Sequence, residues 1–150
     1  MADADRRDRR LTHERHAARL WEILDDYECW PGRKLVGDDG EQAAWQLAQH
    51  AVFDPGLQRR CLEMLEIAVA TGDAPAVHEA CLEDRVRMAD GRAQRYGSQF
   101  VRSADDASVV PWPIEDAAHV DERRRRVGLP SLAEQAHSMQ ERFQARTRSS

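Results

Sequence analysis

The stretch FDPGLQRRCLEMLEIAVATG, residues 53–72, predicts the clearest helix of this chain. Asp54 can cap its first turn, where Pro55 is well tolerated, and Gly72 marks its end. The apolar positions recur with the helical period and form one stripe, made of Leu57, Cys61, Leu65 and Ala68. Such a stripe has to be buried against other elements, so the chain is expected to build a helical core.

Similar periodicity predicts five further helices, at about residues 11–28, 41–51, 74–90, 117–127 and 132–145. The first two are separated by CWPGRKLVGDDG, residues 29–40, which one proline and three glycines make a predicted loop. Ser131 and Glu134 match a capping box at the start of the last helix.

One β-hairpin is predicted between the fourth and fifth helices, from about Arg95 to Ile114. RYGSQFV and VVPWPI are rich in β-branched or aromatic residues, and RSADDAS between them has the composition of a turn. The sequence therefore predicts a mainly α fold, a single-domain bundle of about six helices with one hairpin. The domain is expected over residues 11–145, with a flexible arm at 1–10 and a disordered tail at 146–150.

The chain is acidic, with a formal net charge of −5, which argues against a surface built for nucleic acid. No run approaches the eighteen or so apolar residues that span a bilayer, and the N-terminus lacks the apolar stretch of a secretory signal. Three cysteines cannot all pair within one chain, which suits a reducing compartment. We therefore expect a cytoplasmic protein with no membrane partner.

The hairpin is the first candidate for a ligand site. Residues 91–104 contain three arginines and no acid, and donors and acceptors without charge lie among them: Gln94, Tyr96, Ser98 and Gln99. Strand alternation would place Tyr96 and Ser98 on one face, and Gly97 and Gln99 on the other. A solvated hairpin whose aromatic residues pack on the helices is the alternative interpretation.

The stretch QHAVFDP, residues 49–55, is the second candidate. His50 ends one predicted helix and Asp54 begins the next, so the two side chains can meet across a tight corner. A histidine with a nearby carboxylate is the minimum for a positioned general base. The alternative is a histidine favoured at a helix C-terminus beside an ordinary aspartate N-cap.

Metal and nucleic-acid sites are weaker candidates. His78 and Cys81 are spaced i, i+3, but strong zinc signals come as two close pairs and only this pair exists, so we expect no metal and no cofactor. Four consecutive arginines in DERRRRVG, residues 121–128, point all round a helix and form no stripe, so we do not expect nucleic acid as a partner. Patterns typical of phosphate-binding loops, serine hydrolases and zinc proteases are absent.

Three segments in order resemble a widespread bacterial domain of unknown function: WPGRKLVGDDGEQAAWQLAQHA, LEDRVRMADGRAQRYGSQF and PIEDAAHVDERRRRVGLPSLAE. The resemblance runs from about Trp30 to Glu134. It rests on the motifs Trp-Pro-Gly…Val-Gly, Gln-His-Ala-(Asp), Asp-Arg…Gln-x-Tyr-Gly-(Ser/Thr)-Gln and Pro-Ile-x-Asp…Arg-Arg-x-x-Val-Gly-Leu. Several separate motifs in order make it specific, although they imply no reaction.

The resemblance singles out polar positions, which are typical of a site more than of a core: Gln49, His50, Asp54, Asp84, Arg85, Gln94, Tyr96, Ser98, Gln99, Asp116, Asp121 and Arg124. One position departs from the pattern, since Val52 stands where the family-like motif has aspartate. His50 must then work with Asp54 or another acid.

These observations favour a small cytoplasmic enzyme that hydrolyses, or eliminates from, a small polar or anionic molecule. Its expected catalytic residues are His50, Asp54 and Tyr96. Its expected substrate-binding residues are Gln49, Arg85, Gln94, Ser98, Gln99, Asp116 and Arg124. Two alternatives stay open: a non-catalytic ligand-binding or resistance module, and a protein–protein adaptor anchored by tryptophans. A homodimer is possible.

Overall fold

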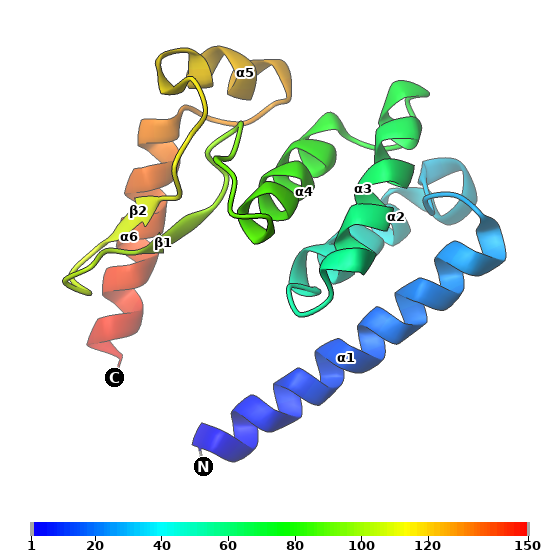
Figure 1. Cartoon of the computed structure of the whole chain (residues 1–150), viewed down its shortest axis with the longest axis horizontal. Coiled ribbons are helices and arrows are strands. Elements are labelled where there is room, and N and C mark those ends of the chain that lie inside the picture. The colour runs from blue at the N-terminus through cyan, green and yellow to red at the C-terminus, as the bar shows by residue number, and fades with distance from the viewer. Residues whose placement is uncertain (1, 150) are drawn as a thin grey trace. The chain divides into compact units, whose positions relative to one another are not determined.

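The computed structural model describes residues 2–149 and confirms a mainly α fold with one antiparallel hairpin (Figure 1). Its helices are α1 (Ala2–Tyr27), α2 (Arg33–His50), α3 (Pro55–Ala70), α4 (Ala76–Ala89), η1 (Ala117–His119), α5 (Val120–Arg126) and α6 (Leu132–Arg148). The strands are β1 (Phe100–Arg102) and β2 (Val109–Pro111). No helix among these residues is long and apolar enough to cross a membrane.

The chain forms two compact units, Met1–Leu82 and Glu83–Ser150, and the boundary falls within α4. The expectation of one domain over residues 11–145 stays a prediction. In the first unit α3 matches its prediction: Asp54 caps it by accepting from the Leu57 amide at 3.0 Å, and it ends before Gly72, whose φ is +74°.

The core of the first unit is built from the predicted stripe of α3 and from apolar residues of α1, α2, the first half of α4 and the connecting loops. It contains Ala17, Leu20, Leu24, Trp30, Ala44, Ala48, Ala51, Leu57, Cys61, Leu65, Ala68, Ala74 and Leu82. Burying a leucine side chain stabilises a fold by about 1.5–3 kcal/mol, so this cluster carries much of the unit's stability.

Two helix boundaries of the first unit differ from the predictions. α1 begins at Ala2 and not at Leu11, because opposite charges spaced four apart, such as Asp5 and Arg9 at 2.6 Å, support an exposed helix. The flexible arm expected at residues 1–10 stays a prediction. The predicted loop over residues 29–40 is wrong for residues 33–40, which belong to α2, although the helix is kinked at Gly37 (φ +76°, ψ 171°).

In the second unit α4 ends where predicted, at Gly91 (φ +71°). The Gly91 amide donates to the carbonyl of Met88 at 3.0 Å and the Arg92 amide to that of Arg87 at 2.9 Å, the pairing of a Schellman cap. The predicted capping box of α6 is also present, with the Ser131 side chain and Glu134 bonded reciprocally. The helix continues to Arg148, past the start of the predicted tail.

The hairpin pairs Phe100 with Pro111 and Arg102 with Val109, and lies against α6 (Figure 1). Its strands are only three residues long, so the alternation predicted for Tyr96 to Gln99 does not apply. Residues 95–99 follow an irregular path instead, because buried side chains, described below, take up their backbone groups.

Candidate functional site

The strongest candidate site of the first unit is a buried pair of side chains, Glu41 on α2 and His78 on α4. His78 Nδ1 is fully buried, and the group facing it is Glu41 Oε1 at 2.7 Å. The other oxygen of the carboxylate, Oε2, accepts from Trp30 Nε1 at 2.9 Å. Glu41, which is 1% exposed, therefore has a hydrogen-bond donor at Oε2 and the imidazole in close contact with Oε1.

The indole ring of Trp45 packs against one face of the His78 imidazole. The two rings are stacked, with centroids 4.2 Å apart and planes within 7°, and Trp45 Nε1 donates to the His78 carbonyl at 3.0 Å. Because a carboxylate can only accept, a proton on Nδ1 would face Glu41 and would leave the lone pair of the neutral ring on Nε2. A carboxylate close to Nδ1 of a histidine is also a feature of hydrolytic triads.

His78 faces a hollow of about 500 Å³. Its walls are Arg33, Asp38, Glu41, Gln42, Pro75 and His78. The hollow therefore joins an imidazole, a cationic side chain, an amide and two carboxylates, and it is large enough for a small molecule.

Arg33 is held at the rim of this hollow. Its Nε lies 2.8 Å from Asp38 Oδ1, and a terminal nitrogen donates to the Gly72 carbonyl at 3.1 Å. The start of α2 is fixed as well, since Asp73 Oδ1 accepts from the Lys34 amide at 2.9 Å. A Cβ on Gly32 would lie 2.1 Å from the Asp73 carboxylate, so glycine is required here for the close approach.

His50 and Asp54, which the sequence analysis placed together at the corner between two helices, have different partners in the structure. Asp54 accepts from Trp21 Nε1 at 2.9 Å in addition to capping α3, as the alternative interpretation had it. His50 is exposed, and its ring centroid lies 5.4 Å from that of His13, beside a hollow of about 350 Å³. Gln49 is buried at the end of the same helix. A general base made of His50 and Asp54 stays a prediction.

The other predicted site residues lie in the second unit, where three buried polar side chains organise residues 94–99. The first is Asp84, which is 0% exposed. Its Oδ1 accepts from the amides of Arg95 at 2.8 Å and Tyr96 at 3.1 Å. Its Oδ2 accepts from the Ser98 amide at 3.0 Å and the Ser98 hydroxyl at 2.7 Å. One carboxylate thus satisfies four donors of one loop.

Arg124, also 0% exposed, binds the acceptors of the same loop. One terminal nitrogen donates to the carbonyls of Tyr96 at 2.7 Å and Gly97 at 3.2 Å, and Nε donates to that of Pro130 at 2.6 Å. The other terminal nitrogen donates to Gln135 Oε1. Five donors in a fixed fork suit arginine to this role.

Gln94 closes the loop on itself. Its Nε2 donates to the carbonyls of Gln99 at 2.9 Å and Trp112 at 2.8 Å, and its Oε1 accepts from the Gln99 amide at 2.9 Å. The Gln99 side chain donates to Ser98 Oγ at 3.0 Å. Asp84, Arg124 and Gln94 therefore form a polar core, and we assign the Gln-x-Tyr-Gly-Ser-Gln motif to folding this loop. Ligand binding by these residues stays a prediction.

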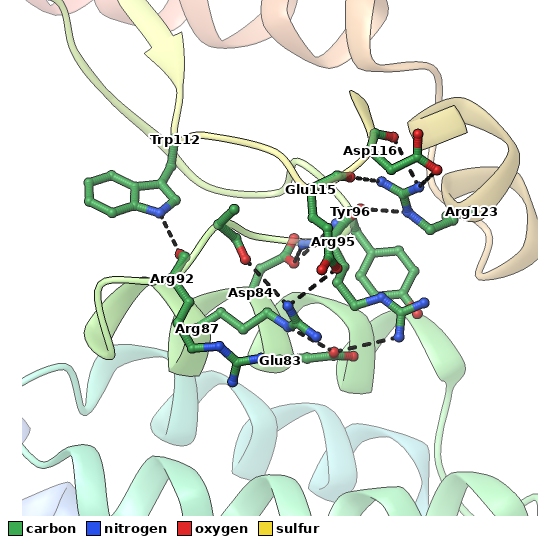
Figure 2. A network of polar contacts seen from close by, with 11 residues as sticks. Glu83, Asp84, Arg87, Arg92, Arg95, Tyr96, Trp112, Glu115, Asp116 and Arg123 are labelled. Atoms are coloured by element: carbon green, nitrogen blue, oxygen red, sulfur yellow. Dashed lines mark hydrogen bonds and ion pairs between the residues drawn. The ribbon is translucent and has the colours of Figure 1, made fainter. Parts of the chain in front are cut away.

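The outer side of this loop carries a network of charges (Figure 2). Glu83 lies 3.1 Å from Arg87 and 3.8 Å from Arg95, and Arg87 reaches Glu115 at 3.4 Å. Arg123 donates to the carbonyl of Arg95 at 2.9 Å. Glu83 and Arg87 are 18% and 16% exposed, whereas their partners Arg95 and Glu115 are 40% and 59% exposed. The two pairs with an exposed partner contribute about 0–1 kcal/mol each, and the network as a whole connects the loop to α4 and α5.

Three further predicted residues lie around this network. Asp116 pairs with His119 Nδ1 at 3.0 Å, and this hydrogen bond is the main reason why the pKa of His119 is raised. Tyr96 has the Arg95 guanidinium 5.6 Å from its ring centroid, and Arg85 is half-buried on α4.

Across residues 2–149 no three His, Cys, Asp or Glu side chains converge in the way a metal ion would require. Sequence reasoning considered His78 only beside Cys81 and missed Glu41 altogether. The available signal was the Glu41 to Trp45 segment inside the Trp-Pro-Gly motif, but nothing in the spacing connects it with His78.

The chain belongs to the family of unknown function DUF6624, whose family model matches residues 11–147. This confirms the resemblance and extends it beyond Trp30–Glu134. No curated protein and no solved structure matches the chain.

Proposed function

We propose that the protein is a small enzyme that uses His78 as a general base on a small anionic molecule bound in the hollow beside it. The observation that carries the proposal is the 2.7 Å contact between His78 Nδ1 and a buried carboxylate. A contact of this kind leaves Nε2 as the basic atom and stabilises the imidazolium that forms when it takes a proton.

The residues of the hollow fit hydrolysis. His78 Nε2 would take a proton from a water molecule, the resulting hydroxide would attack the substrate, and the imidazolium would return the proton to the leaving group. Arg33 would pair with the negative group of the substrate and with charge that develops during attack. Elimination fits too, with Nε2 removing a proton from carbon. The proposal keeps the class of reaction expected from sequence and replaces His50 by His78 as the base.

The test uses two histidine variants in parallel. The wild-type protein is incubated with a panel of phosphate and carboxylate esters, and products are detected by mass spectrometry. His78→Gln is expected to lower turnover by about 10²- to 10⁴-fold, the usual contribution of a general base. The exposed His50→Gln is expected to keep it. Loss of turnover in His50→Gln alone would support the base predicted from sequence instead.

Glu41→Gln tests the orientation of the ring. The new side chain has one acceptor and one donor where Glu41 has two acceptors. If its oxygen accepts from Trp30, its amide faces His78 Nδ1, which must then carry the lone pair, so Nε2 carries the proton and no longer acts as a base. We expect turnover to fall to the level of His78→Gln, while far-ultraviolet circular dichroism keeps its helical signal.

A non-catalytic binding module is the second candidate. It is favoured by the nature of the lining residues, since none of the six has a hydroxyl or thiol that could act as a nucleophile. Saturable binding of an anion with no product, unaffected by Glu41→Gln but weakened by Arg33→Ala, would support this function. We place either activity in the cytoplasm because of the odd number of cysteines.

A further inference from the structure

A second hollow lies in the other unit, between the hairpin and α6, and it has a different chemistry. Its volume is about 340 Å³, at the lower end of the range for small-molecule sites. It is lined by Phe100, Val101, Arg102, Val109, Met139, Arg142, Phe143, Arg146 and Thr147. Five of these residues are apolar, three are arginines and none is acidic.

The apolar walls are fixed in place. Met139 and Phe143 are spaced i, i+4, so they share one face of α6, and both are half-buried. The hairpin is tied to the same helix, because the Val109 amide donates to Gln140 Oε1 at 3.0 Å. The Arg102 guanidinium lies 5.6 Å from the centroid of the Phe143 ring, a cation–π distance.

The cationic rim comes from two elements. Arg142 and Arg146 lie one turn apart on α6, and Arg102 lies on β1. Arg102 has Asp106 at 3.6 Å, but both side chains are more than two-thirds exposed, so water screens this pair strongly. Glu141, the acidic residue next to Arg142 in sequence, contacts His137, with 2.9 Å between Glu141 Oε1 and His137 Nε2. Three cations around an apolar floor attract an anion that carries an apolar body.

We propose that this hollow binds a small amphipathic anion, a molecule with a flat or aliphatic apolar part and one phosphate or carboxylate group. The apolar part would lie on Met139 and Phe143, and the anionic group would pair with Arg142, Arg146 or Arg102. Charge complementarity and the small volume favour such a molecule over a helix of a partner protein. The proposal is independent of the activity assigned to His78.

The probe is 2-naphthyl phosphate, with 2-naphthol and inorganic phosphate as its two halves. Isothermal titration of the full chain is expected to show binding of 2-naphthyl phosphate, with each half binding at least tenfold more weakly. The double variant Arg142→Glu/Arg146→Glu is expected to lose at least tenfold in affinity. The matched control is Arg125→Glu, a change of an exposed arginine on α5 outside the hollow, which should bind as the wild type does.

Three results would overturn the proposal. Equal affinity in the double variant would show that the arginines of α6 take no part. Binding of 2-naphthol as tight as that of its phosphate would show an apolar site with no preference for anions. A dimer in light scattering that the double variant abolishes would show that this face joins two copies of the chain. Circular dichroism of both variants confirms that the helices persist.

Discussion

Asp84→Asn is the change expected to destabilise the second unit most sharply. The wild-type carboxylate accepts four hydrogen bonds in a site that is 0% exposed. Asparagine keeps one acceptor, enough for the amides of Arg95 and Tyr96. Its NH₂ group then faces the Ser98 amide, so two donors meet in the interior.

The magnitude follows from these contacts. One buried amide without a partner costs about 1–3 kcal/mol, and the loss of negative charge weakens the two hydrogen bonds that remain by about 0.5–1 kcal/mol each. The expected loss of unfolding free energy is therefore about 3 kcal/mol. Urea unfolding followed by circular dichroism and by tryptophan fluorescence measures it, with Trp112 reporting on the second unit.

Glu83→Gln is the matched control, because the neighbouring acid on α4 pairs with the side chains of Arg87 and Arg95. Its expected cost is below about 1 kcal/mol. If Asp84→Asn costs no more than Glu83→Gln, the carboxylate does not hold the loop, and the assignment of a structural role to the motif is refuted.

Three further predictions concern single positions. Gly97→Ala should destabilise by about 2–4 kcal/mol in urea, because φ is +67° and the new Cβ would lie 2.9 Å from Leu132 Cδ1; a cost below about 1 kcal/mol would contradict the close packing. Burial raises the pKa of the Cys61 thiol from 9.0 to about 12. Unfolding therefore releases its proton above pH 9, so stability should fall between pH 9 and 12, and Cys61→Ala should remove this part of the fall. The raised pKa of His119 should return toward its ordinary value in Asp116→Asn, and an unchanged NMR titration would show that another group is responsible.

The helices could be predicted because their signals are local. The stripe of α3, the aspartate that caps it and the glycines that follow α3 and α4 act within a few residues of each other, and the structure has them as expected. The break at Gly37 was mistaken for a loop over the whole segment, because a glycine count cannot distinguish one kink from irregular structure.

The sites were harder to predict because the same polar residues can either bind a ligand or satisfy the backbone of a buried loop. Gln94, Ser98 and Gln99 have the composition of a binding site, but their side chains bond to the backbone of their own loop, to each other or to the buried Asp84. Glu41 and His78 are far apart in sequence and meet only because α2 packs against the first turn of α4. No local pattern encodes such a contact.

The orientation of the His78 ring decides whether this unit can provide a general base. Long-range ¹H–¹⁵N correlation spectra of the histidine side chains report which ring nitrogen carries the proton. The account predicts that neutral His78 is protonated at Nδ1 in the wild type and at Nε2 in Glu41→Gln, and that inorganic phosphate shifts its resonances in the wild type. A ring protonated at Nε2 in the wild type, or one that phosphate leaves unchanged, would contradict it.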